Sequence, residues 1–262
     1  MQEKQVAILI DGDNISPKYA EYIRQEAAAF GRIQVFRLYG SINSPSVKSW
    51  YRVMPKYGIA PILQISYAQG KSIADQALTI DAMDILHSGE IDIICLVTSD
   101  SDFTKLAYRI KESGKALIGM GEQKTNESLA QACDEFKVLD LIYQVDEGEV
   151  QEESATDIEL QESTIGEVTE KEELLVKLET ISVPTEDAII GSILNMLEDD
   201  WENLASVGIN LKKQIPGFDA RNYGYKNMTK FIKSNEDKFE LKVEVAKDGV
   251  HKVVFIKRKS QE

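Results

Sequence analysis

Two runs of five apolar residues, each leading into acidic residues, constrain the fold of this chain more than any other feature. The first run, residues 6–10, is followed by Asp11 and Asp13, and the second, residues 93–97, is followed closely by Asp100 and Asp102. Short apolar runs rich in β-branched residues are typical of buried strands in a parallel sheet. Because the carboxyl ends of such strands meet at the ligand-binding edge of an α/β sheet, we expect these aspartates to lie close together.

The rest of the first half alternates between strand-like and helix-like patterns. Candidate strands are 6–10, 33–39, 60–65, 93–98, 115–119 and 137–142, and candidate helices are 17–30, 46–57, 73–88, 103–113 and 126–134. Strands that alternate with helices at this spacing predict a mostly parallel sheet with helices on both faces. The expected fold class of residues 1–145 is therefore α/β.

The acidic residues expected at this sheet edge predict a site for a divalent cation. Neighbouring carboxylates raise each other's pKa unless a cation holds them, and oxygen ligands suit Mg²⁺ or Mn²⁺. Asp75, four residues after Lys71 at the start of a helical pattern, is a further candidate ligand. Asp81 lies about 240° around the same helix and is expected to pair with the next strand or with solvent. A cation at this edge could position a phosphate and activate a water for phosphodiester hydrolysis.

Each acidic motif also has a purely structural interpretation. Asp11 and Asn14 could cap the helix that follows them, and Asp102 could be the N-cap of a later helix. Lys71 and Asp75 could form an i,i+4 pair that supports a helix start. The prediction of a metal site therefore rests on the combination of motifs.

The histidine and cysteine content narrows the chemistry. The only histidines, His87 and His251, argue against histidine-rich zinc sites and Ser-His-Asp catalysis. Cys95 and Cys133 lie in apolar segments without metal-ligand spacing, which indicates buried free thiols in a reducing cytoplasm. With no signal-peptide pattern and no apolar run near the ~20 residues that span a bilayer, a cytoplasmic protein without a membrane partner is expected.

The net charge of −14 is distributed unevenly along the chain. Residues 146–173 hold twelve acidic residues and one lysine, whereas residues 205–262 hold thirteen basic residues and seven acidic ones. High charge with few aromatic residues predicts a flexible acidic linker, which we place at 146–183. The basic C-terminal part can bind nucleic acid in spite of the acidic overall composition.

Residues 184–262 are expected to form a second, small domain. Three helical patterns precede a strand, a turn and a second strand, which is the order of a winged helix (α+β). The helices are expected from Pro184, from Leu204 to Pro216 and from Gly224 to Ser234, and the strands at 239–245 and 253–256 around a turn at 247–249.

Four motifs of the first half carry a resemblance to a known family. They are Ile10-Asp11-Gly12-Asp13-Asn14, Lys71-Ser72-Ile73-Ala74-Asp75, Leu78-Thr79-Ile80-Asp81 and Val97-Thr98-Ser99-Asp100-Ser101-Asp102-Phe103. Together they resemble the NYN domain of the PIN-like nuclease superfamily, in its LabA-like branch, over residues 5 to about 143. The resemblance implies metal-dependent RNA cleavage with Mg²⁺ or Mn²⁺. It implies a metal-binding and catalytic cluster of Asp11, Asp75, Asp100 and Asp102, with Asn14 and Ser99 nearby, and Lys71 is a candidate phosphate contact.

Residues 184–259 are similar to the OST-HTH (LOTUS) domain, a winged-helix module of RNA-processing proteins. The matching segments are 204–208, 211–219 and 223–228. The resemblance implies binding of RNA or of a protein partner. Basic side chains would meet phosphates and a tyrosine could stack on an unpaired base, although aromatic residues in a small domain more often belong to the core. The candidate RNA contacts are Lys212, Lys213, Arg221, Tyr223, Tyr225, Lys226, Lys230 and the terminal Lys257, Arg258 and Lys259.

The expected function is that of a metal-dependent ribonuclease with a tethered RNA-binding module. The alternative is a non-catalytic RNA-binding or scaffolding regulator with a vestigial acidic site. The motif Asp11-Gly12-Asp13 also resembles haloacid-dehalogenase-like phosphatases, but Ile15 stands where those enzymes have Thr or Val. A TOPRIM-type site would need a glutamate after the first strand, and the sequence has none there.

Overall fold

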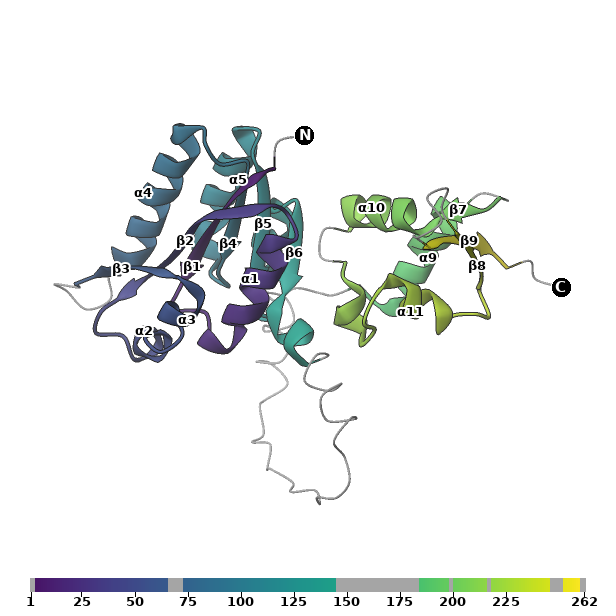
Figure 1. Cartoon of the computed structure of the whole chain (residues 1–262), viewed down its shortest axis with the longest axis horizontal. Coiled ribbons are helices and arrows are strands. Elements are labelled where there is room, and N and C mark those ends of the chain that lie inside the picture. The colour runs from purple at the N-terminus through teal and green to yellow at the C-terminus, as the bar shows by residue number, and fades with distance from the viewer. Residues whose placement is uncertain are drawn as a thin grey trace, which may run out of the picture. The chain divides into compact units, whose positions relative to one another are not determined.

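The computed structural model describes residues 3–65, 73–144, 184–197, 200–215, 218–245 and 252–259. These residues belong to two compact units, one within Met1–Ile181 and the other within Ser182–Glu262 (Figure 1). Three predictions fall outside the described residues: the flexible linker at 146–183, the position of Lys71 and the turn at 247–249.

A six-stranded parallel sheet forms the centre of the N-terminal unit. Its strands are β1 (Gln5–Asp11), β2 (Arg32–Ser41), β3 (Ala60–Gln64), β4 (Ile93–Val97), β5 (Ala116–Gly121) and β6 (Glu135–Val138). The spatial order is β3-β2-β1-β4-β5-β6, so the chain builds outward from β1 on one side and then returns to its other side for β4. This reversal makes the ends of β1 and β4 a topological switch point, where open α/β sheets bind ligands.

Helices cover both faces of this sheet (Figure 1). They are η1 (Pro17–Tyr19), α1 (Ala20–Ala28), α2 (Pro45–Trp50), α3 (Met54–Tyr57), α4 (Ile73–Ser88), η2 (Ser101–Phe103), α5 (Thr104–Glu112) and α6 (Glu127–Ala132). Side chains alternate between the two faces along a strand. Ile8 and Ile10 of β1 therefore pack into one core with Ile23 of α1. Ala7 and Leu9 are buried on the other face, where α4 packs against β1, β2 and β3.

The predicted α/β fold is confirmed, and two of its elements differ from expectation. The helix expected at 46–57 is wrong as a single element, because Pro55 lies in the first turn of α3 and starts a separate helix there. The strand expected at 137–142 is wrong after its first two residues, because β6 ends at Val138 and residues 139–144 are helical. Leu139 and Ile142 are both buried, at the spacing of one helix face.

Both cysteines are free and buried in this unit, as predicted. Cys95 lies in β4 and Cys133 directly after α6, with exposed fractions of 0% and 1%. Burial raises the pKa of both thiols, that of Cys133 to about 12. Neither thiol is therefore ionised at neutral pH in the folded unit.

The C-terminal unit combines helices with a small antiparallel sheet. Its elements are α9 (Glu186–Met196), β7 (Glu202–Asn203), α10 (Leu204–Gln214), η3 (Ala220–Tyr223), α11 (Met228–Lys233), β8 (Phe239–Val245) and β9 (Lys252–Arg258). The strand order is β7-β9-β8, and a core from all three longer helices and the sheet includes Ile193, Leu211, Phe231 and Ile256. The three helices and the two longer strands were predicted, whereas β7, with only two residues, was not.

Across the described part of the chain, no helix combines the length and the apolar character needed to cross a membrane.

Candidate functional site

Asp11 is the buried centre of the acidic site. It ends β1 and is 2% exposed. Because Ile10 pairs with Val97 of β4, Asp11 lies level with Thr98 at the same sheet edge. The Thr98 hydroxyl donates to Asp11 Oδ2 at 2.8 Å, and Asn14 Nδ2 donates to the same oxygen at 2.7 Å. The carboxylate is thus held in one orientation by donors from two strand ends.

The electrostatic surroundings of Asp11 disfavour its ionised form. The pKa of Asp11 is raised to about 6, mainly by burial; the hydrogen bonds from Asn14 and Thr98 lower it in part, and the charges of Asp75 and Asp13 add to the increase. Asp11, Asp13 and Asp75 are therefore close enough for their charges to interact. A cation beside them would favour the ionised carboxylates and relieve this repulsion.

Helix α4 brings Asp75 to the site from its first turn, where the helix dipole favours a carboxylate. The same helix is tied to β2 through Asp81. Both Asp81 carboxylate oxygens lie 2.6 Å from Arg37 Nη1, and the Tyr39 hydroxyl donates a short hydrogen bond to Asp81 Oδ2. Asp81 was expected to pair with the next strand along the chain or with solvent, but its partner is the earlier strand β2.

The loop after β4 joins the site through its backbone. The Asp100 N–H donates to Thr98 Oγ1 at 3.0 Å, which links Asp100 to the network around Asp11. Asp100 Oδ1 accepts the Asp102 N–H at 2.9 Å and caps η2. The alternative role of N-cap that the sequence suggested for Asp102 is therefore wrong, because Asp100 caps η2. Asp102 itself is exposed.

Ser99 is directed toward the neighbouring strand β5. Its Oγ accepts the backbone N–H of Glu122 at 2.9 Å. Glu122, an acidic residue that the sequence prediction did not include, forms an ion pair with Lys124 at 2.7 Å. Burial and then the charge of Glu122 raise the pKa of Tyr19, which packs in the core on the α1 face of the sheet. Glu122 thus lies beside Tyr19, and its position directly after an apolar run is the signal that could have identified it.

Two residues of the Asp11 network were absent from the predicted site. Thr98 is the first residue after β4 and occupies the place that Asp11 has after β1, which was the available signal. Asp13 follows Asp11 by two residues, and its Oδ2 accepts the Ser41 N–H from the end of β2 at 3.1 Å. The site therefore draws on the ends of β1, β2 and β4.

The donor set of this site fits a hard divalent cation by its chemistry. All the side chains that meet here offer oxygen ligands, which Mg²⁺ and Mn²⁺ prefer. Among the described residues, no three His, Cys, Asp or Glu side chains are already grouped closely enough to hold one ion. If Asp11, Asp75 and Asp100 were to hold one ion together, their carboxylates would have to lie closer to one another than they do here.

The candidate RNA contacts of the C-terminal unit differ in how they are held. Arg221 is bound to Asp219 through two side-chain contacts, Nε to Oδ1 at 3.0 Å and Nη2 to Oδ2 at 2.7 Å. The exposed residues among these candidates are Lys213, Lys226, Lys230, Arg258 and Lys259.

Tyr223 and Tyr225 are part of an aromatic cluster inside this unit. Their ring centroids lie 5.8 and 5.2 Å from that of Phe231. The Tyr223 hydroxyl donates to the Pro184 carbonyl at 2.8 Å, and the Tyr225 hydroxyl donates to Glu186 Oε1 at 3.0 Å. These contacts favour the core role that the sequence left open for both tyrosines.

Comparison with known families decides what the first unit is. A family model described as the NYN domain matches residues 5–140, just over half of the 262-residue chain. The chain belongs to the NYN family. A second model, the OST-HTH/LOTUS domain, matches residues 182–251 and follows the NYN domain, so both resemblances and their order are confirmed. The NYN domain is part of the PIN-like nuclease superfamily.

Individual relatives of this NYN protein add little to the family match. An uncharacterized protein of Methanocaldococcus jannaschii is 30% identical over 125 residues, which cover 46% of this chain and 49% of that protein. The chain therefore spans about half the length of this curated relative. A solved structure of unknown function from Vibrio parahaemolyticus is 22% identical, covering 53% of this chain and 96% of that one with a TM-score of 0.45. The solved structure of an uncharacterized protein of Nitrosomonas europaea is 21% identical, and the match covers 41% of this chain and 95% of that one with a TM-score of 0.26.

Proposed function

We propose that this protein is a ribonuclease whose NYN domain cleaves RNA at the Asp11 site with Mg²⁺ or Mn²⁺. The observation that carries the proposal is the state of Asp11, a carboxylate that is 2% exposed and whose pKa burial raises to about 6 at the switch point of the sheet. Strongly shifted carboxylates at a ligand-binding edge are characteristic of functional sites. A capping role alone gives no reason to bury this group beside two other carboxylates.

In this proposal Asp11, Asp75 and Asp100 hold the cation. When bound, the cation supplies positive charge that positions the scissile phosphate and lowers the pKa of a water. Thr98 and Asn14 keep the Asp11 carboxylate in a fixed orientation, as partners behind metal ligands do. Asp102 and Ser99 complete the predicted catalytic set at the same strand end, with Ser99 supporting the Glu122 backbone.

The OST-HTH domain is proposed to bind the RNA that the NYN domain cleaves. Exposed lysines such as Lys213 and Lys230 supply phosphate contacts. The acidic segment 146–183 would tether the two domains and raise the local concentration of one binding site near the other. A nuclease that holds its substrate in this way needs little affinity at the cleavage site itself.

The second candidate function is a non-catalytic RNA-binding regulator. It is favoured by one observation, the lack of a preformed group of three possible ligands within the described residues. The two functions differ in a single measurable property, because only the ribonuclease cleaves RNA when a divalent cation is added.

The test is a cleavage assay with varied RNAs in Mn²⁺, Mg²⁺ or EDTA. We expect cleavage with a divalent cation, none in EDTA, and none with the Asp11→Asn variant. Asp84→Asn, which changes an exposed aspartate of α4, is the matched control and should cleave normally. Full cleavage by Asp11→Asn would exclude the proposed site, and no cleavage under any condition would favour the regulator.

A further inference from the structure

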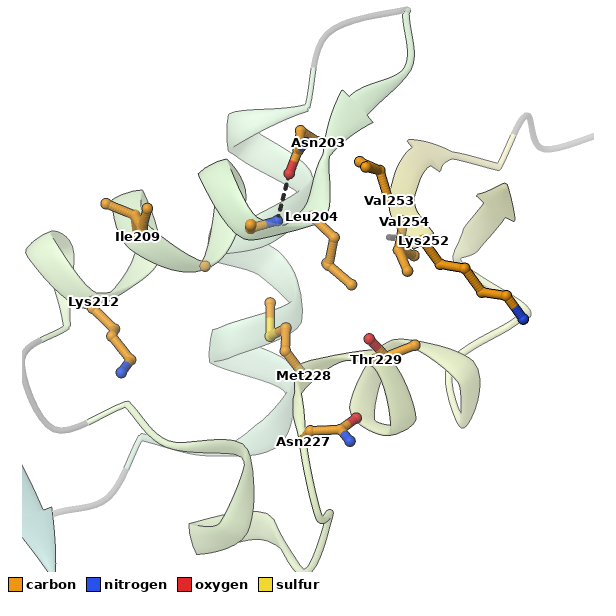
Figure 2. Close-up of a pocket in the computed structure, with 12 residues that line it drawn as sticks. Asn203, Leu204, Ile209, Lys212, Asn227, Met228, Thr229, Lys252, Val253 and Val254 are labelled. Atoms are coloured by element: carbon orange, nitrogen blue, oxygen red, sulfur yellow. Dashed lines mark hydrogen bonds between the residues drawn. The ribbon is translucent and has the colours of Figure 1, made fainter. Parts of the chain in front are cut away.

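The OST-HTH domain contains a groove. Of the predicted RNA contacts, Lys212 alone is among the described residues that line it. The groove lies between α10, the beginning of α11 and β9, with a volume of about 570 Å³ (Figure 2). Its walls are mainly apolar, with Ile209 on α10, Met228 on α11 and Val253 on β9. This volume is in the range of pockets that bind small organic ligands.

The charge around the groove is positive. Of the described residues that line it, two are lysines and none is acidic. Lys212, in the last turn of α10, and Lys252, the first residue of β9, stand at opposite sides of the groove (Figure 2). Positive charges on both sides of an apolar groove complement a ligand that has an apolar centre with an anionic group on each side.

Two asparagines and one threonine add polar groups to the groove. Asn203 Oδ1 accepts the Ala205 N–H at 2.8 Å, and Asn227 Oδ1 accepts the Lys230 N–H at 3.0 Å. Each asparagine therefore uses its oxygen as a helix cap, so its amide nitrogen is the side-chain group that could donate to a ligand. The Thr229 hydroxyl also lines the groove. Hydrogen-bonding groups beside apolar walls match a nucleobase, which has apolar faces and a polar edge.

We propose that this groove binds an unpaired nucleotide of single-stranded RNA. The base lies between the apolar walls, and the phosphates on its two sides meet Lys212 and Lys252. The inference rests on the proposed RNA binding of this domain and says where the RNA is held. It also moves the base contact away from Tyr223 and Tyr225, whose rings pack in the core. An acidic peptide with an apolar side chain is the competing ligand, but it makes less use of the asparagine and threonine groups.

Gly208 allows the groove to be filled without disturbing the fold. It lies in α10 and lines the groove, and a Cβ built on it meets no atom within 4 Å. Gly191 in α9 is a matched position, because a Cβ there also meets nothing within 4 Å and the residue is not part of the lining. Since leucine is favoured over glycine in a helix interior, both Gly208→Leu and Gly191→Leu should fold.

The experiment measures the contribution of the bases to RNA affinity. The full chain is titrated, in EDTA to prevent cleavage, against a labelled oligouridine of about twelve nucleotides and an abasic strand of the same length. We expect the wild type and Gly191→Leu to bind the intact strand about tenfold more tightly than the abasic strand. Gly208→Leu should bind both strands equally, with its affinity for the abasic strand unchanged. Circular dichroism melting verifies that both variants are folded.

Three outcomes would overturn the proposal. The preference for the intact strand could survive in Gly208→Leu, or it could disappear equally in Gly191→Leu. The wild type could also show no such preference while an acidic Glu/Leu peptide binds and Gly208→Leu abolishes that binding, which would make the groove a protein-binding site. Metal-dependent cleavage is assayed in parallel with Gly208→Leu, so that a failure of the groove proposal is distinguished from a failure of the proposed ribonuclease.

Discussion

The Asp11 carboxylate destabilises the cation-free protein at neutral pH. Its pKa is about 6 in the folded chain, against an ordinary value of 3.8, so the folded state binds the proton more tightly than the unfolded state. The stabilisation from this proton is fully present below pH 3.8 and is lost as the pH rises through about 6. A shift of this size corresponds to roughly 3 kcal/mol of unfolding free energy.

Asp11→Asn should therefore be more stable than the wild type at pH 7.5 in EDTA. We expect an increase of on the order of 1–3 kcal/mol in the unfolding free energy, because the amide carries no charge to bury. The difference should shrink as the pH falls toward 4, where the wild-type carboxyl is protonated. Urea denaturation between pH 4 and 8 measures it, with Asp84→Asn as the control. Equal stability of wild type and Asp11→Asn at every pH would contradict the burial argument.

Cation binding at Asp11 should release a proton below pH 6. Because the cation needs the ionised carboxylate, the apparent affinity for Mn²⁺ should fall about tenfold for each pH unit below 6 and level off above it. Calorimetric titrations in two buffers of different ionisation enthalpy measure the released protons. A constant affinity between pH 5 and pH 7 would place the ion away from Asp11.

Residues of the site could be predicted from the sequence where they follow an apolar run that predicts a strand. Asp11 and Asn14 follow the first apolar run, and they do contact each other. The role of Thr98 could not be predicted in this way, because it depends on the register of β1 with β4 across 87 positions of the chain. The same applies to Glu122, whose surroundings depend on which face of the sheet α1 covers.

At the scale of secondary-structure elements, α4 is the support of the site. It carries Asp75 in its first turn and is fastened to β2 by Asp81, six residues later. The Arg37 and Asp81 side chains are 34% and 23% exposed, so the ion pair is partly shielded from water. The position of Asp75 relative to Asp11 therefore depends on a contact made elsewhere on the helix.

Asp81→Asn should weaken cation binding, although the residue at position 81 does not contact the cation. The amide cannot form the ion pair with Arg37, and hydrogen bonds to charged groups contribute about 1.5–3 kcal/mol each. We expect a lower melting temperature and a several-fold higher Mn²⁺ concentration for half-maximal cleavage, with activity regained at saturating Mn²⁺. Asp84→Asn on the same helix should change neither value. Complete loss of cleavage at saturating Mn²⁺ in a folded Asp81→Asn protein would instead make Asp81 part of the site itself.

Some elements of the NYN domain were predicted closely, and others were not. The helix expected at 73–88 coincides with α4, and the run at 93–97 coincides with β4. Residues 137–142 are a short apolar run, and such a run does not distinguish a strand from a buried helical turn. β7 has two residues and is defined by its pairing with β9, so no local pattern could reveal it.

At the scale of the whole molecule, the two domains are separate compact units joined by an acidic segment. A chain that ends near residue 145 keeps all the described strands of the NYN domain. It should fold and retain basal cleavage, but bind long RNA more weakly because the second binding site is no longer held nearby. Filter binding and cleavage assays on the shortened and full chains test this prediction. An insoluble shortened chain would show that the NYN domain depends on the OST-HTH domain for its stability.

The two buried cysteines both belong to the NYN domain, and the sequence has no cysteine elsewhere. A thiol reagent can modify Cys95 and Cys133 only when that domain opens, so the labelling rate of the intact protein reports the opening equilibrium of one domain alone. The stability of the NYN domain can thus be followed without cutting the chain or adding a probe. Mn²⁺ bound at Asp11 should slow the modification, whereas RNA held only by the OST-HTH domain should leave its rate unchanged.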